Sequence, residues 1–154
     1  MSKGMSLLGL SALCVAGLLT AAPASATLGE AVSTVTSDAQ HLRASARVKQ
    51  ASGYEVHEMQ SGGATVREYA SGGKVFAVAW QGSARPDLRQ LLGSYYPQLQ
   101  QAVAAEKTQR AGRHPVSIAR EDLVIQMGGH QRAFTGRAYL RNAMPASVKA
   151  EDIR

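Results

Sequence analysis

The sequence predicts an α+β fold for residues 27–154: an antiparallel sheet of about five strands, made of a three-strand meander and a C-terminal hairpin, with helices packed on one face. Two observations predict it. Gly-Gly pairs separate short runs rich in β-branched and aromatic residues, as tight hairpins require. Between the meander and the hairpin, leucines and tyrosines recur at helical spacing. The chain has 154 residues, 45% of them hydrophobic and 18% charged, so we expect a single domain with one core.

Residues 1–26 are predicted to be a signal peptide. Lys3 precedes an uncharged apolar run over 7–22, and the small residues 24–26 form a cleavage site. The run is shorter than the ~20 residues of a membrane span. We therefore expect cleavage after Ala26, a periplasmic or secreted protein, and no transmembrane span after cleavage; an uncleaved anchor is the alternative. The one cysteine, Cys14, lies in this run, so the mature chain has no disulfide and no thiolate site.

The mature chain is predicted to begin with an amphipathic helix over residues 28–50, whose firm part spans 37–48. Its Ser, Thr and Val residues are poor helix formers, so we expect the helix to depend on docking against a larger body. Apolar residues recur at alternating steps of four and three, which places them on one helix face: Leu28, Val32, Val35, Ala39, Leu42 and Ala46.

Residues 54–81 are predicted to form three strands joined by turns at 62–63 and 72–73, where glycine accepts the positive φ of a tight hairpin. The third strand is apolar on both faces, so it should be central and covered on both sides. One face carries Phe76, Val78 and Trp80, and the other carries Val75, Ala77 and Ala79.

Residues 86–107 are predicted to be helical, because Pro86 and Asp87 suit a helix start and a leucine-tyrosine stripe follows. Pro97 interrupts this stripe, and its ring opposes the carbonyl of residue 93, which predicts a kink or a break. Residues 108–117 are polar and are predicted to be a loop.

The last elements are a hairpin and a tail. A strand over 123–127, a turn over 128–131 and a return strand over 132–140 are expected. From residue 145 onward the chain is polar and is expected to fray.

Several chemistries lack their sequence signals. The chain has no HExxH, CxxC or GxSxG motif, and its glycine pairs lie in hairpins and do not open a helix. We therefore expect no cofactor and no metal, and a binding or interaction module of the cell envelope that is not a catalyst. An exported protein is also a poor candidate for nucleic-acid binding.

The best ligand-binding candidates lie near the C-terminal hairpin. Arg137, Tyr139 and Arg141 alternate on one face of the return strand, and Arg132 lies beside the turn. Guanidinium groups with an aromatic between them suit phosphates and acidic sugars, so the expected partners are anionic envelope glycans or lipids. The alternative is a solvated basic face, since the chain carries a net charge of +6.

A second partner class is an envelope protein. Trp80, Tyr95 and Tyr96 are candidates for an exposed contact patch, although a buried Trp is the commoner outcome. The end strands of the sheet offer a place for a partner to add a strand. The oligomeric state is not encoded in any pattern of the sequence.

The rival function is a small hydrolase or metal-dependent enzyme acting on the envelope, with His57, Glu58, Glu68 and His130 as its candidate residues. His57 and Glu58 are adjacent on one strand, so they should face opposite sides of the sheet. Glu58 shares a face with Tyr54 and Val56, which allows either a buried carboxyl with a raised pKa or a strand end in solvent.

The chain resembles a family of small exported bacterial proteins known as domain of unknown function 2844. The resemblance covers about residues 28–153. It is carried by KVFAVAWQG with PDLRQLLGSYY, and by DLVIQMGGHQRAFTGRAYL. The resemblance implies an exported single domain and transfers no activity, substrate or site residue.

Overall fold

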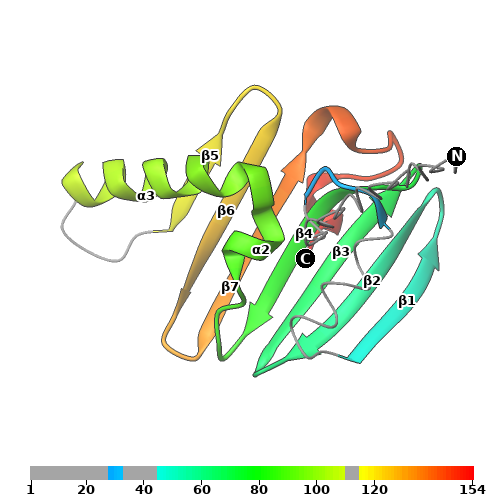
Figure 1. The fold of residues 1–154 in the computed structure, drawn as a ribbon, viewed down its shortest axis with the longest axis horizontal. Coiled ribbons are helices and arrows are strands. Elements are labelled where there is room, and N and C mark those ends of the chain that lie inside the picture. The colour runs from blue at the N-terminus through cyan, green and yellow to red at the C-terminus, as the bar shows by residue number, and fades with distance from the viewer. Residues whose placement is uncertain (1–27, 33–44, 110–114) are drawn as a thin grey trace, which may run out of the picture.

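Seven antiparallel strands form one sheet in the order β1-β2-β3-β4-β7-β6-β5 (Figure 1). The computed structural model describes residues 28–32, 45–109 and 115–154. The strands are β1 (Ser45–Ala51), β2 (Tyr54–Ser61), β3 (Ala64–Ser71), β4 (Lys74–Gly82), β5 (Val116–Ala119), β6 (Leu123–His130) and β7 (Ala133–Leu140). One helical segment joins β4 to β5. It consists of α2 (Leu88–Leu92), the 3₁₀ turn η2 (Gly93–Tyr95) and α3 (Tyr96–Gln109).

The predicted fold class is wrong in its strand number and in its balance of elements. The sheet has seven strands, and the described chain is mostly β, with one α-helical segment and two short 3₁₀ helices, η3 (Arg141–Ala143) and η4 (Ala150–Asp152). The two additional strands are β1, which occupies the end of the predicted helix 28–50, and β5, which occupies the end of the predicted loop 108–117. The fold is therefore a continuous antiparallel sheet rather than five strands covered by several helices.

A cross-strand partner decided the conformation of the segment before the meander. β1 pairs with β2 over seven residues, from Ser45↔Gln60 to Ala51↔Tyr54. The hydrogen bonds and cross-strand contacts with β2 stabilise this segment more than its weak helical propensity would stabilise a helix. Residues 28–32 are not α-helical either, because Ala31 bridges Lys74 and the Gly29 N–H donates to the Val75 carbonyl at 2.8 Å. The remainder of that predicted helix, and residues 1–27, lie outside the described residues.

The predicted meander is confirmed as β2, β3 and β4, with positive φ at both glycines of each turn. β4 lies in the middle of the sheet and is buried over six consecutive residues. A bulge opposite Tyr69 and Ala70 makes Phe76 the extra residue. Phe76 consequently joins the face of Ala77, and not the face of Val78 as strict alternation predicted.

The sheet buries residues on both of its faces. The helix face, which carries Val78 and Trp80, packs against α2 and α3. The opposite face, here called the second face, carries Ala77 and Ala79 and packs against the C-terminal segment (residues 145–154). Trp80 is only 3% exposed and packs with Tyr95 and Tyr96, so it belongs to the core and does not form an exposed contact patch.

The helical segment starts and breaks near the predicted places. The Asp87 carboxylate caps α2, accepting from the backbone N–H groups of Arg89 at 2.9 Å and Gln90 at 3.2 Å. The break occurs at Gly93, which ends α2 with a φ of 46°. Pro97 lies in the first turn of α3, where the helix needs no N–H from it.

The C-terminal hairpin is longer than predicted, and the tail does not fray. β6 continues through Gly128 and Gly129 to His130, so the turn falls at residues 131–132. The tail is anchored by Val148, which is 7% exposed, and by Ile153, which is fully buried. Both side chains pack into the core of the second face, which helps to dock this polar stretch there.

Candidate functional site

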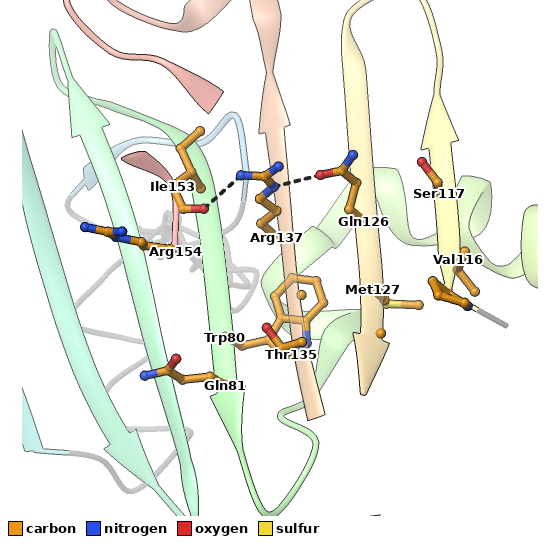
Figure 2. A pocket seen from close by; sticks show the side chains of 13 residues that line it. Trp80, Gln81, Val116, Ser117, Gln126, Met127, Thr135, Arg137, Ile153 and Arg154 are labelled. Atoms are coloured by element: carbon orange, nitrogen blue, oxygen red, sulfur yellow. Dashed lines mark hydrogen bonds between the residues drawn. The ribbon is translucent and has the colours of Figure 1, made fainter. Parts of the chain in front are cut away.

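A groove of about 450 Å³ crosses the second face over β4, β7, β6 and β5 (Figure 2). These four strands form its floor, and the C-terminal segment forms the wall on the β4 side. Its lining residues are Trp80, Gln81, Pro115, Val116, Ser117, Gln126, Met127, Gly128, Thr135, Gly136, Arg137, Ile153 and Arg154.

Strand alternation places polar side chains on this floor. Gln81 pairs with Thr135 across β4 and β7, and both are exposed. Gln126 pairs with Arg137 on β7 and with Ser117 on β5. Since cross-strand partners point to the same face, two parallel rows of hydrogen-bonding groups run across the strands of the groove.

Two glycines shape the floor in different ways. Gly128 lies on the second face, where a Cβ would meet nothing closer than the Pro115 Cβ at 3.9 Å, so it leaves an opening in the floor. Gly136 faces the other side, where a Cβ would overlap the Cζ2, Cε2 and Nε1 atoms of Trp80. The absence of a side chain at Gly136 therefore allows the indole ring to lie flat against β7 behind the groove.

Arg137 joins the groove to the C-terminal segment. Its Nε donates to Gln126 Oε1 at 2.8 Å, and its Nη1 donates to the Ile153 carbonyl at 3.4 Å (Figure 2). Nη1 also donates to the carbonyl oxygen of Ala150. These bonds hold the guanidinium plane at the edge of the groove. The described lining includes the Arg137 guanidinium and no Asp or Glu side chain, while the Arg154 side chain points away from the other lining residues (Figure 2). The Arg137 guanidinium makes the groove favourable for an anion.

The four predicted ligand residues do not meet at one place. Arg137 borders the groove, while Tyr139, on the same face, is half-buried against the second-face core. Arg132 lies in the hairpin turn at one end of β7, and Arg141 follows the other end, where its Nη1 donates to the Arg120 carbonyl at 3.1 Å. An eight-residue strand separates Arg132 from Arg141, which is about 25 Å.

A second charged cluster lies beyond the C-terminal segment, on β1, β2 and β3. Arg67 Nε donates to Glu58 Oε2 at 2.8 Å, and Lys49 Nζ lies 3.9 Å from the same oxygen. The hydrogen bond from Arg67 holds the pKa of the Glu58 carboxyl below its usual range, against the opposing effect of burial. The raised pKa allowed from the sequence is therefore wrong, because a guanidinium faces this carboxyl.

Tyr69 and Arg67 fix the end of the chain beside this cluster. The Tyr69 hydroxyl donates to the Arg154 carbonyl at 2.9 Å and accepts from the Arg154 N–H at 3.1 Å. Arg67 Nη1 donates to the same carbonyl at 2.9 Å. Burial raises the pKa of the Tyr69 hydroxyl, so the hydroxyl stays protonated and able to donate in neutral solution.

The rival residues are placed apart. His57 and Glu68 are cross-strand neighbours on the helix face, and both are buried. Glu58 lies on the second face, as the alternation predicted. His130 ends β6, and three strands lie between β6 and β2, a separation of about 19 Å. Within residues 28–32, 45–109 and 115–154, no group of three His, Cys, Asp or Glu side chains is placed to hold a metal ion.

Sequence reasoning missed most of the groove. Gln81, Ser117, Gln126 and Thr135 carry no motif, and only the alternation along β7 identified part of the face. The missing signal was strand order, because β4 and β7 are neighbours in the sheet but more than fifty residues apart in the chain.

The described helices include none that is both long and apolar enough to cross a membrane. The predicted signal peptide lies in the part of the chain that the structure leaves out.

Comparison with known families supports the resemblance. A family model described as a protein of unknown function, DUF2844, matches residues 24–153. The chain belongs to the DUF2844 family. The match confirms the family that the sequence resembled, and the DUF2844 description assigns no activity. No curated protein matches the chain.

Among solved structures, the DUF2844 chain is similar to a cysteine-rich secretory protein from Staphylococcus aureus subsp. aureus Mu50. The identity is 13% and the TM-score 0.47, with 75% of this chain and 45% of that chain covered. The chain thus spans less than half the length of that protein, and so distant a likeness assigns it neither activity nor ligand.

Proposed function

We propose that this chain is an exported, non-catalytic binding protein of the cell envelope, and that the groove on the second face takes an anionic, hydroxyl-rich ligand such as an acidic envelope glycan. The observation that carries the proposal is the composition of the lining. Four uncharged hydrogen-bonding side chains and the Arg137 guanidinium line the groove, with no Asp or Glu side chain among its described lining residues.

The lining matches the chemistry of an acidic sugar chain. Amide and hydroxyl groups donate to and accept from sugar hydroxyls, as Gln81, Gln126, Ser117 and Thr135 can. A guanidinium supplies the charge-assisted bond to a carboxylate or sulfate. Arg137 already uses its Nε and Nη1 within the chain, so its Nη2 is the atom that it offers to a ligand.

The same lining favours a binding role over hydrolysis. Hydrolysis of a glycan needs two carboxyl groups facing one cleft, and the described lining residues include no Asp, Glu or His. The envelope location rests on the predicted signal peptide and on the family resemblance.

The test is binding of the purified protein to polygalacturonic acid, measured by titration calorimetry at two salt concentrations, with neutral dextran as the uncharged comparison. Gly128→Tyr adds bulk at the opening in the floor, where the backbone leaves room for a Cβ. Gln60→Tyr is the matched control, because Gln60 is exposed on the second face of β2 outside the groove.

We expect salt-sensitive binding of the polyuronate, a loss of about tenfold or more in Gly128→Tyr, and no loss in Gln60→Tyr. Equal binding by the two variants would place the ligand elsewhere. Failure of the unmodified protein to bind either polysaccharide would reject the glycan as the ligand class.

A further inference from the structure

The outer edge of β1 is the longest strand edge that the described sheet leaves unpaired. β1 is the first strand in the sheet order, and it is paired along its whole length on the β2 side only. No residue of β1 makes a backbone hydrogen bond on its other side within the described part of the chain. Such an edge presents a row of N–H and C=O groups that another strand can pair with.

The opposite edge of the sheet is a poorer site. β5 has four residues against seven in β1. Pro115 directly precedes β5 and has no N–H to donate. An added strand would gain few main-chain hydrogen bonds there, which favours β1.

The side chains of β1 define what kind of strand would fit. On the second face, Arg47 and Lys49 are both exposed, and the Lys49 side chain is 68% exposed. Glu58 lies opposite Arg47, and its Oε2 lies 3.9 Å from Lys49 Nζ while it accepts a shorter hydrogen bond from Arg67 at 2.8 Å, so one carboxylate faces three cations. On the helix face, Val48 is 54% exposed. Among the described residues, it is the one large hydrophobic side chain that is exposed to solvent.

A second copy of the chain is a poor match for this edge in the three registers that pair most of β1. When β1 pairs antiparallel with itself, the register centred on Val48 puts Arg47 opposite Lys49, and the registers centred on Arg47 or on Lys49 put each of these cations opposite itself. Like charges directly opposite each other destabilise a strand pair. The two cations therefore act against self-association and leave acidic strands as the better partners.

We propose that β1 accepts an added strand from a partner protein, an extended segment in which acidic residues alternate with apolar ones. The acidic side chains pair with Arg47 and Lys49, the apolar side chain between them covers Val48, and the main chain completes the hydrogen bonds of the edge. This inference is independent of the glycan groove, because β1 and the groove lie on opposite sides of β3.

The test uses three capped seven-residue peptides as probes. The first alternates glutamate and valine, the second has lysine in place of glutamate, and the third is the glutamate peptide with the amides of one edge N-methylated. Binding is measured by calorimetry, and the site is located by backbone hydrogen exchange in the folded protein.

Two double variants test the charges of β1. The first combines Arg47→Glu with Lys49→Glu. The matched control combines Arg89→Glu with Arg120→Glu, which changes two exposed cations outside β1.

We expect the glutamate peptide to slow exchange in β1 and to bind about tenfold more tightly than the lysine peptide. The β1 variant should reverse this preference, while the control variant should keep it. N-methylation should abolish binding, because the outer amides can no longer pair.

Four results would overturn the proposal: no peptide binding at millimolar concentration, equal binding of the N-methylated peptide, protection confined to β5, or an unchanged preference in the β1 variant. Protection of β1 by self-association without peptide would instead make a second copy the occupant, and would also overturn it.

Discussion

Arg67 and Arg137 lie opposite the same residue, Ala79, from the two strands that flank β4. Both donate to main-chain carbonyls of the last five residues, Arg67 to that of Arg154 and Arg137 to those of Ala150 and Ile153. The small side chain of Ala79 leaves the space that the buried Ile153 fills. Two arginines thus hold the end of the chain over the middle of the sheet, and this end forms the wall of the groove.

Replacing Arg137 should release this wall. In Arg137→Ala the C-terminal carbonyls and Gln126 lose a charged donor, and bonds to charged groups contribute about 1.5 to 3 kcal/mol each. We expect the free energy of unfolding to fall by about 2 to 3 kcal/mol and hydrogen exchange to accelerate over residues 148–153. Arg89→Ala, at an exposed position, should change stability by about 0.5 kcal/mol or less. Unchanged exchange over 148–153 in Arg137→Ala would show that burial of Ile153 alone holds the tail.

Gly136 and Gly128 of the hairpin should differ in their response to an added methyl group. Gly136→Ala drives a Cβ into the Trp80 indole, and overpacking of a core costs about 1 to 3 kcal/mol. Gly128→Ala, on the neighbouring strand, meets only ordinary contact and should leave the thermal midpoint nearly unchanged. The double variant Gly136→Ala with Trp80→Phe should be less destabilised than the sum of its single variants. Strict additivity would mean that the indole does not lie over Gly136.

The Glu58 and Arg67 pair predicts a dependence of stability on acid. Because the pKa of Glu58 is lowered in the folded state, its contribution is complete above the ordinary glutamate value of about 4.3 and is lost as the pH falls through the lowered pKa. Glu58→Gln should cost about 1 kcal/mol at neutral pH. Between about pH 6 and pH 3, the stability of the unmodified protein should therefore decline more than that of Glu58→Gln. Parallel declines in denaturant titrations would contradict this assignment.

Arg132 should be replaceable without loss of stability. It has a φ of 64° in the hairpin turn, a conformation that costs a non-glycine residue about 1 kcal/mol. Arg132→Gly relieves this strain, so we expect stability to rise by about 0.5 kcal/mol. Since Arg132 does not line the groove, the affinity of the Arg132→Gly variant for polygalacturonic acid should stay within a factor of about two of that of the unmodified protein. A larger loss of affinity in this stable variant would show that Arg132 contacts the ligand.

Local patterns predicted the parts of the fold that local forces decide. The glycine pairs located the turns of the meander, Asp87 marked the start of α2, and the apolar residues on both faces of β4 predicted a central strand. Each of these features depends on the backbone preference or capping of a few neighbouring residues. These features could therefore be predicted without knowing which distant segments of the chain they contact.

The candidate site was predictable only in part. Alternation along β7 put Arg137 on the right face, but it could not show that Arg137 would bond to Ala150 and Ile153 or that Arg132 and Arg141 would lie at opposite ends of the strand. The polar partners on β4, β6 and β5 became neighbours through the sheet order.

By itself, then, the sequence determined the family, the two turns of the meander and the apolar residues that are able to form a core. Tertiary structure alone decided that Ser45–Ala51 and Val116–Ala119 become strands, that the polar tail docks, and that four strands enclose a groove. The physical reason is that strand pairing and tail docking draw their stability from hydrogen bonds and apolar contacts between residues far apart in the chain, which no local periodicity encodes.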